Sequence, residues 1–318
     1  MVNMISQSAS ALSEAHEYIS QGEPGQAKVV LENALPDDLE NEDLSTAISF
    51  CAFWIDVFES LQGQSPFDRR ETLMSQWCNF SKWVSDIDNV DARCVYAFKK
   101  GVFTRAVEEY SQVEDDGDPK QQAEIFRKKG LCSKRLGNFE SALESLKTAN
   151  SLYPSQAEIL AELADCYDLC GETKWAKILF KEAFYIDAEK VDLENLDSPL
   201  VHGLIDRVEN EGFAGRELKE WIPVYGVLLG VFNVKRGLRS QEIGRLKQEI
   251  YAKENELKDP ANNSSLLVPR LMNLYFWLMD YYLLSKESTK KINELLLKIK
   301  ILDASIYNEY FDFDEKSK

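Results

Sequence analysis

The sequence predicts an all-helical protein built from stacked helix hairpins, and three observations support this prediction. Apolar residues recur with the 3.6-residue period of an α-helix along most of the 318 residues. Alternating β-branched runs bounded by hairpin dipeptides, which indicate strands, are nearly absent. A segment that starts at Ala123 recurs at Ala157, an offset of 34 residues. A period of this length is typical of helical repeat proteins.

The two repeated segments, 123–156 and 157–190, share small and large apolar slots in one register. Gly137 falls on Gly171, and Ala142 falls on Ala176. Small residues let two helices approach closely, and the two glycines can adopt the left-handed conformation that ends a helix. The residues that fill the structural slots of the repeats are Gly130, Gly137, Ala142, Pro154, Ala164, Tyr167, Gly171, Ala176, Phe180 and Ala183.

These slots resemble those of the tetratricopeptide repeat, W-x2-L-G-x2-Y, then A-x3-F, then P. The second segment reads Leu160-x2-Leu163-Ala164-x2-Tyr167 and then Ala176-x3-Phe180, with Ala188 where proline is usual. The resemblance implies an alpha-alpha superhelix, that is, a TPR-like α-solenoid. It also implies that the first helix of each hairpin lines a concave groove for a peptide or a partner helix.

Weaker similarity extends towards the N-terminus. Gly101, Phe103, Ala106 and Tyr110 repeat the turn and second-helix slots, which predicts three hairpins over 87–190. Residues 1–86 match the same template in degenerate form. Within this region, a long hairpin rich in tryptophan and phenylalanine is predicted over 43–86, with its turn at 62–66. These aromatics are expected in the core, with an interface hot spot as the alternative.

The repeat period is lost after about residue 190, so 191–318 is expected to be a helical C-terminal region that caps the array or dimerises. Helices are expected at 199–211, 215–235, 240–258, 266–285 and 288–308. The fourth is apolar almost all round, so either the other C-terminal helices or a second subunit must cover it.

Composition narrows the classes of function. A net charge of −17 argues against nucleic-acid binding and favours a basic partner, if the partner is charged. The longest apolar stretch, 221–234, is too short for a bilayer span. With no leader evident and six scattered cysteines expected to be reduced core thiols, a cytoplasmic location is expected.

Signals for catalysis and for cofactors are weak. The chain has two histidines, His16 and His202, and no nucleophile elbow or phosphate-binding glycine loop. No metal site, cofactor or catalytic residue is therefore expected, and the protein is not expected to be an enzyme.

The predicted groove joins the first helices of the two clear repeats. Helical phase places Glu124, Arg127, Leu131, Lys134 and Arg135 of one repeat opposite Asp165 and Asp168 of the next. These groups form either a mixed-charge peptide groove or ion pairs with each other. Chaperone-adaptor members of the family hold a terminal carboxylate with a clamp of cations and amides. Acids occupy three of the five corresponding positions here, so that function is disfavoured.

The leading hypothesis is a non-catalytic protein–protein interaction scaffold that binds a partner protein or peptide in the groove of the array. One alternative is a self-associating structural component that forms a homodimer through its C-terminal helices. Another is a helical enzyme domain in 191–318 to which the repeats recruit a substrate.

Overall fold

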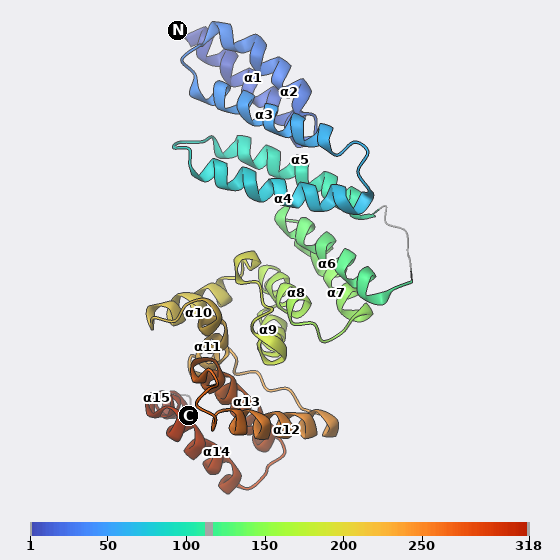
Figure 1. Ribbon diagram of the computed structural model, residues 1–318. Coiled ribbons are helices and arrows are strands. Elements are labelled where there is room, and N and C mark those ends of the chain that lie inside the picture. Colours follow the sequence, from blue (N-terminus) through green and yellow to red (C-terminus); the bar gives the residue numbers. More distant parts are fainter. Residues whose placement is uncertain (1, 112–116, 317–318) are drawn as a thin grey trace. The chain divides into compact units, whose positions relative to one another are not determined.

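The computed structural model describes residues 2–111 and 117–316, which form helices and no strand (Figure 1). This confirms the predicted all-helical class. The chain divides into two compact units, Met1–Leu152 (unit 1) and Tyr153–Lys318 (unit 2). The division falls inside the predicted 87–190 array rather than at either end of it.

Unit 1 contains seven α-helices among its described residues. They are α1 (Val2–Ser20), α2 (Pro24–Ala34), α3 (Glu42–Ser60), α4 (Pro66–Ser85), α5 (Ala92–Ser111), α6 (Pro119–Arg135) and α7 (Phe139–Leu152), with a short 3-10 helix at Leu35–Asp37. The side chains of Asn41, Ser65 and Asp118 cap α3, α4 and α6 by accepting hydrogen bonds from backbone N–H groups of the first turn.

The core of unit 1 is a cluster of aromatic rings from α3, α4 and α5. Phe50, Trp54 and Phe80 are fully buried. The ring centroids of Phe50 and Phe80 lie 4.9 Å apart in an edge-to-face arrangement, and Phe98 of α5 lies 5.5 Å from Phe80. Phe50, Trp54 and Phe80 belong to the hairpin predicted at 43–86, and their burial confirms the core interpretation for these three residues.

Gly101 does not form the turn that the sequence predicted. It lies inside the continuous helix α5, and the hairpin at this position is instead α4–α5, with Asn89 of its connection at φ 58°. A Cβ on Gly101 would stand 2.2 Å from the backbone oxygen of Ile19 in α1. Gly101 therefore allows α1 and α5 to pack closely, a use of glycine that sequence alone cannot separate from a turn.

The described part of unit 2 holds eight α-helices. They are α8 (Ala157–Leu169), α9 (Thr173–Asp187), α10 (Pro199–Asn210), α11 (Gly215–Leu228), α12 (Ser240–Glu256), α13 (Ser264–Leu284), α14 (Thr289–Leu302) and α15 (Ala304–Lys316), with a 3-10 helix at Leu193–Asn195. The helix expected at 215–235 ends at Leu228, before Gly230 with φ 67°. The helix expected at 288–308 divides at Asp303, whose carboxylate accepts the N–H of Ser305 at the start of α15.

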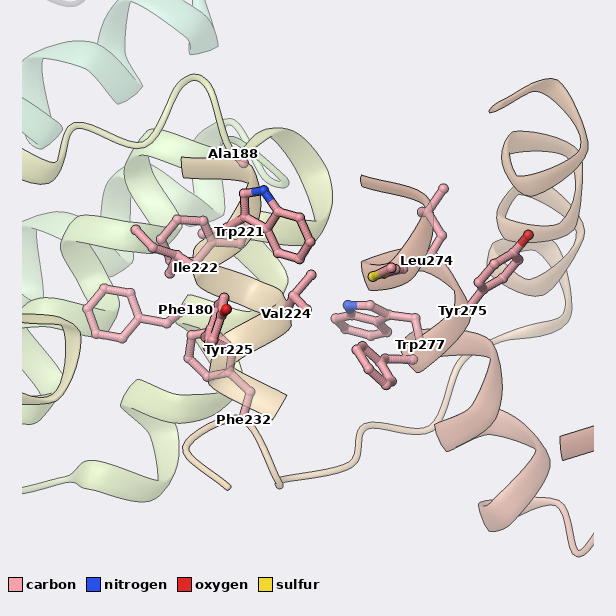
Figure 2. Packing of buried hydrophobic residues seen from close by; sticks show 14 of the residues in the cluster. Phe180, Ala188, Trp221, Ile222, Val224, Tyr225, Phe232, Leu274, Tyr275 and Trp277 are labelled. Carbon is pink, nitrogen blue, oxygen red and sulfur yellow. The ribbon is translucent and has the colours of Figure 1, made fainter. Parts of the chain in front are cut away.

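The apolar helix α13 is enclosed within unit 2. Nine consecutive residues from Leu271 to Met279 are buried, and α13 packs against α11, α12 and α14. Figure 2 shows side chains of α11, among them Trp221 and Val224, between Phe180 of α9 and Trp277 of α13. Helices of the same unit therefore provide the cover that the sequence required.

Three hairpin turns share one backbone pattern. In the α6–α7 turn the N–H of Gly137 donates to the carbonyl of Lys134 (2.9 Å), and the N–H of Asn138 donates to the carbonyl of Ser133 (2.9 Å). The same pair of bonds forms at Gly171 between α8 and α9 and at Gly22 between α1 and α2. All three glycines have φ near +80°. This is the Schellman motif, which needs a left-handed residue and so favours glycine.

Candidate functional site

A cleft of about 440 Å³ lies in unit 1 beside the N-terminal half of α6. Its walls come from α4 and α6, and Tyr110 of α5 contributes to the lining. The lining residues are Arg70, Glu71, Tyr110, Asp118, Lys120, Gln121, Glu124, Ile125 and Lys128. The cleft therefore includes one residue of the predicted groove, Glu124, and lies on the first helix of the first clear repeat.

Two helix starts position the walls of this cleft. Proline at the first position of α4 and of α6 has the φ that a helix needs and lacks the N–H that would be unsatisfied there. Before α6, the carboxylate of Asp118 accepts the backbone N–H of Lys120 (3.0 Å). These local signals set the residues at which α4 and α6 begin. They therefore help to place Arg70 of α4 and Gln121 of α6 in the cleft lining.

Ion pairs within unit 1 engage the charges along one wall. Arg127 holds Glu124 with two hydrogen bonds, Nε to Oε2 at 2.7 Å and Nη2 to Oε1 at 2.8 Å. Lys128 pairs with Glu71 across the cleft, and its Nζ lies 3.9 Å from Glu124. For Glu124 and Arg127 this favours the pairing interpretation, and such half-exposed pairs contribute about 0–1 kcal/mol each.

The hydroxyl of Tyr110 is a possible hydrogen-bond donor and acceptor in the lining of the cleft. Its side chain is only 4% exposed, and its hydroxyl has no hydrogen-bond partner among the described residues. The guanidinium carbon of Arg70 lies 5.0 Å from the centroid of the tyrosine ring. Burial raises the pKa of Tyr110 well above its usual value, so the hydroxyl stays protonated and can donate a hydrogen bond.

The sequence identified Tyr110 only as an apolar repeat slot and did not single out Arg70. The missed signal is the polar end of a tyrosine in a slot that leucine and phenylalanine fill in the other repeats, at Leu146 and Phe180. A buried tyrosine usually brings its hydroxyl to a partner, so an unsatisfied one needs an explanation, such as a bound water or ligand group.

The other groove residues of α6 lie in its C-terminal half. Leu131 and Arg135 are half-buried, and Lys134 is buried. Lys134 and Arg135 stand in the last turn, where a cation interacts favourably with the partial negative charge of the helix end.

The two predicted groove residues of α8 bind the start of α10. Asp165 is fully buried, and its Oδ1 accepts the backbone N–H groups of Asp197 (2.9 Å) and Ser198 (2.7 Å). Asp168 accepts the hydroxyl of Ser198 at 2.5 Å. The structure thus gives both carboxylates hydrogen-bond partners within unit 2.

The structural slots of the repeats lie mainly between the helices of each hairpin. Ala142, Ala164, Ala176, Phe180 and Ala183 are fully buried. A Cβ on Gly130 would stand 2.7 Å from Cγ of Leu146, so this glycine permits close contact of α6 with α7. Tyr167 is half-buried and stacks on Trp175, and Pro154 is exposed in the connection after α7.

The cysteines and histidines described next do not line the α4–α6 cleft. Burial raises the pKa of the Cys51, Cys94 and Cys132 thiols to about 12, so these sulfurs stay protonated. His16 has a pKa lowered chiefly by burial, and its Nε2 has no hydrogen-bond partner among the described residues. Nε2 of His202 lies 2.9 Å from the carbonyl oxygen of Leu196.

Metal-binding clusters and membrane-spanning helices are absent from the described ranges, 2–111 and 117–316. Within them, no cluster of three or more His, Cys, Asp or Glu residues is placed to hold a metal ion. In the same ranges, no helix combines the length and apolar character that crossing a membrane requires.

The sequence was not similar enough to known proteins to assign a family. No protein-family model matches the sequence, and no curated protein is significantly similar to it.

Proposed function

We propose that this chain is a non-catalytic scaffold of tetratricopeptide-type hairpins, stacked as an α-solenoid, that binds a segment of a partner protein in the α4–α6 cleft. The recurring Schellman turns and the buried small residues of α6–α7 and α8–α9 support the repeat assignment. A cytoplasmic location, in which cysteines stay reduced, is part of the same proposal.

The buried hydroxyl of Tyr110 is the observation that carries the choice of cleft. An unsatisfied buried hydroxyl costs about 1–3 kcal/mol, so a ligand group that accepts its hydrogen bond recovers stability. A backbone carbonyl of an extended peptide is such an acceptor. Ile125, which also lines the cleft, offers apolar contact to a side chain of the same peptide.

The charges of the cleft lining and of the whole chain are compatible with a bound polypeptide that carries mixed or basic charge. The lining residues include three acids and three bases, while the whole chain carries −17 and attracts cations at long range. The partner class is therefore a flexible protein segment, and the long-range field favours one with basic residues.

The proposal is tested by filling the cleft with Gln121→Trp and repeating an affinity capture from native cell extract. Ser141→Trp, on an exposed position of α7, adds the same side chain away from the cleft. We expect captured partners to fall at least tenfold with the first variant and to stay unchanged with the second. Equal partner lists for wild type and Gln121→Trp would contradict binding in this cleft.

A further inference from the structure

Helix α14 presents two large aliphatic side chains to solvent. Leu297 is 58% exposed and Ile301 is 76% exposed. They are four residues apart, so they lie about 40° from each other around the helix and form one stripe. A contiguous exposed apolar stripe can mark a contact site when polar residues border it.

The opposite face of α14 already has its partners. Leu295, Leu296 and Ile299 are buried in the core of unit 2. Lys298 donates to Glu254 of α12 (2.6 Å), and Lys291 donates to Glu287 (3.0 Å). Packing within the unit therefore accounts for the inner face and leaves the stripe uncovered.

Two lysines, Lys290 and Lys300, flank the stripe, and the exposed Glu294 lies on the same face, about 20° from Ile301 around the helix. α14 carries four lysines and one glutamate, in a chain whose acids outnumber its bases by 54 to 37. Lys290 lies almost in line with Leu297, two turns earlier, and Lys300 lies about 60° to one side. Neither pairs with a carboxylate in the described part of the chain, although Lys300 lies over the ring of Tyr307 at 4.9 Å.

We propose that the outer face of α14 is a docking surface for an acidic amphipathic helix of a partner protein. Two aliphatic residues of that helix would pack on Leu297 and Ile301, and its acids would pair with Lys290 and Lys300. The helix-on-helix mode needs apolar anchors at this spacing, and the flanking charges select the partner. This second surface lies in unit 2 and does not depend on the α4–α6 cleft.

Charge complementarity favours this occupant over a second copy of the chain. Pairing α14 with α14 of another molecule would bring the lysines of two helices together, with one glutamate each to offset them. An anionic bilayer would also meet lysines and aliphatics. It is a large charged surface, however, and would repel a chain of net charge −17 more strongly than a single acidic helix would.

The proposal is tested with the full chain and two fluorescent synthetic helices that carry the same pair of leucines. One helix is flanked by glutamates and the other by lysines. We expect the acidic helix to bind, in the roughly 10–1,000 µM range of small interfaces, and the basic helix to bind at least tenfold more weakly. Anisotropy gives the dissociation constants, and methyl NMR of the isoleucines locates the contact at Ile301.

Two variants and one control make the result specific. Leu297→Gln with Ile301→Gln should remove binding of the acidic helix, and Lys290→Glu with Lys300→Glu should reverse the preference between the two helices. Leu39→Gln, at an aliphatic residue of unit 1 that is equally exposed, should change nothing.

Other occupants are outcomes that would overturn the proposal. Failure of the acidic helix to bind overturns it, as does equal binding of the basic helix. Binding of phosphatidylserine vesicles without binding of the acidic helix would assign the stripe to a membrane surface. A dimer in sedimentation that Leu297→Gln with Ile301→Gln dissolves would assign it to a second copy.

Discussion

The two units are both helical, but the polar contacts between their helices differ in burial. In unit 1, the centroids of neighbouring aromatic rings in α3, α4 and α5 lie 4.9–6.5 Å apart, and Gly101 and Gly130 allow close contact between helices. In unit 2, buried polar groups join segments that are distant in sequence. Lys181 pairs with Asp280, and Arg270 donates to the carbonyl of Phe184 (3.2 Å). Both units therefore combine tight packing with long-range ion pairs, but the Lys181–Asp280 pair of unit 2 is more deeply buried than the Lys128–Glu71 pair of unit 1.

The largest expected effect tests the dependence of unit 1 on close helix contact. In Gly101→Ala the new Cβ meets a backbone oxygen, which cannot move as a side chain can, so we expect a loss of at least about 3 kcal/mol in the free energy of unfolding. Urea denaturation followed by circular dichroism measures it. Gly203→Ala, with open space at its Cβ inside α10, should instead stabilise by about 0.5–1 kcal/mol. If Gly101→Ala and Gly203→Ala changed the free energy of unfolding equally, close contact at Gly101 would not be the cause.

The dependence of unit 2 on polar contacts is tested by Asp280→Ala. This change leaves the ammonium of Lys181, which is buried against Trp277, without its carboxylate. We expect a loss of about 2–3 kcal/mol. Glu189→Ala, which breaks the exposed pair with Arg216, should cost less than about 0.5 kcal/mol. Hydrogen exchange should show faster opening of α9 and α13 in the first variant alone, and similar losses in both would contradict the distinction.

A smaller, pH-dependent effect concerns Glu220 of α11. Burial raises its pKa to about 7, so the folded state holds a proton that the unfolded chain loses near pH 4.5. The contribution of this group to stability is therefore full below pH 4.5 and is lost as pH rises through 7. We expect Glu220→Gln to stabilise the protein by about 1–2 kcal/mol at pH 8, an amount reduced for partial solvent screening, and by almost nothing at pH 4.5. A difference that does not change with pH would show that ionisation is not the cause.

The smallest expected effect concerns the end of α13. Lys286 has φ 51° at the position that glycine occupies in the three hairpin turns, and its N–H donates to the carbonyl of Leu283 (3.3 Å). Lys286→Gly should stabilise unit 2 by about 0.5–1 kcal/mol, because glycine adopts this conformation without steric cost. Lys286→Ala removes the charge but keeps the backbone strain. Its free energy of unfolding, measured by thermal unfolding, should therefore stay within about 0.5 kcal/mol of the wild-type value. A gain as large as that of glycine would point to charge instead.

The same contrast explains what could be predicted from the sequence. Helical class follows from the apolar period, and the turn glycines Gly137 and Gly171 follow from the repeat. The role of Gly101 could not be predicted, because close packing and a left-handed turn both require glycine. The end of α11 was placed too late, since its apolar pattern continues beyond Gly230.

The candidate site was predicted only in part. Helical phase places Glu124 on an exposed face of α6, and this residue lines the α4–α6 cleft, but helical phase cannot show that Arg127 pairs with it. Asp165 was assigned to the groove by its position in the repeat. Its contact with the backbone at Asp197 and Ser198 depends on a segment outside the repeat, which no period reveals. Long-range polar contacts carry no local sequence signal.

Site-specific photo-crosslinking tests the central proposal, binding of a partner segment in the α4–α6 cleft, most directly. A benzophenone amino acid is placed at Gln121 in the cleft, or at Ser141 on α7 as control, and irradiated in native extract. We expect a partner polypeptide to be crosslinked at position 121 and not at 141, with Tyr110→Phe weakening the crosslink. No adduct at 121, or the same adducts at both positions, would contradict the proposed cleft.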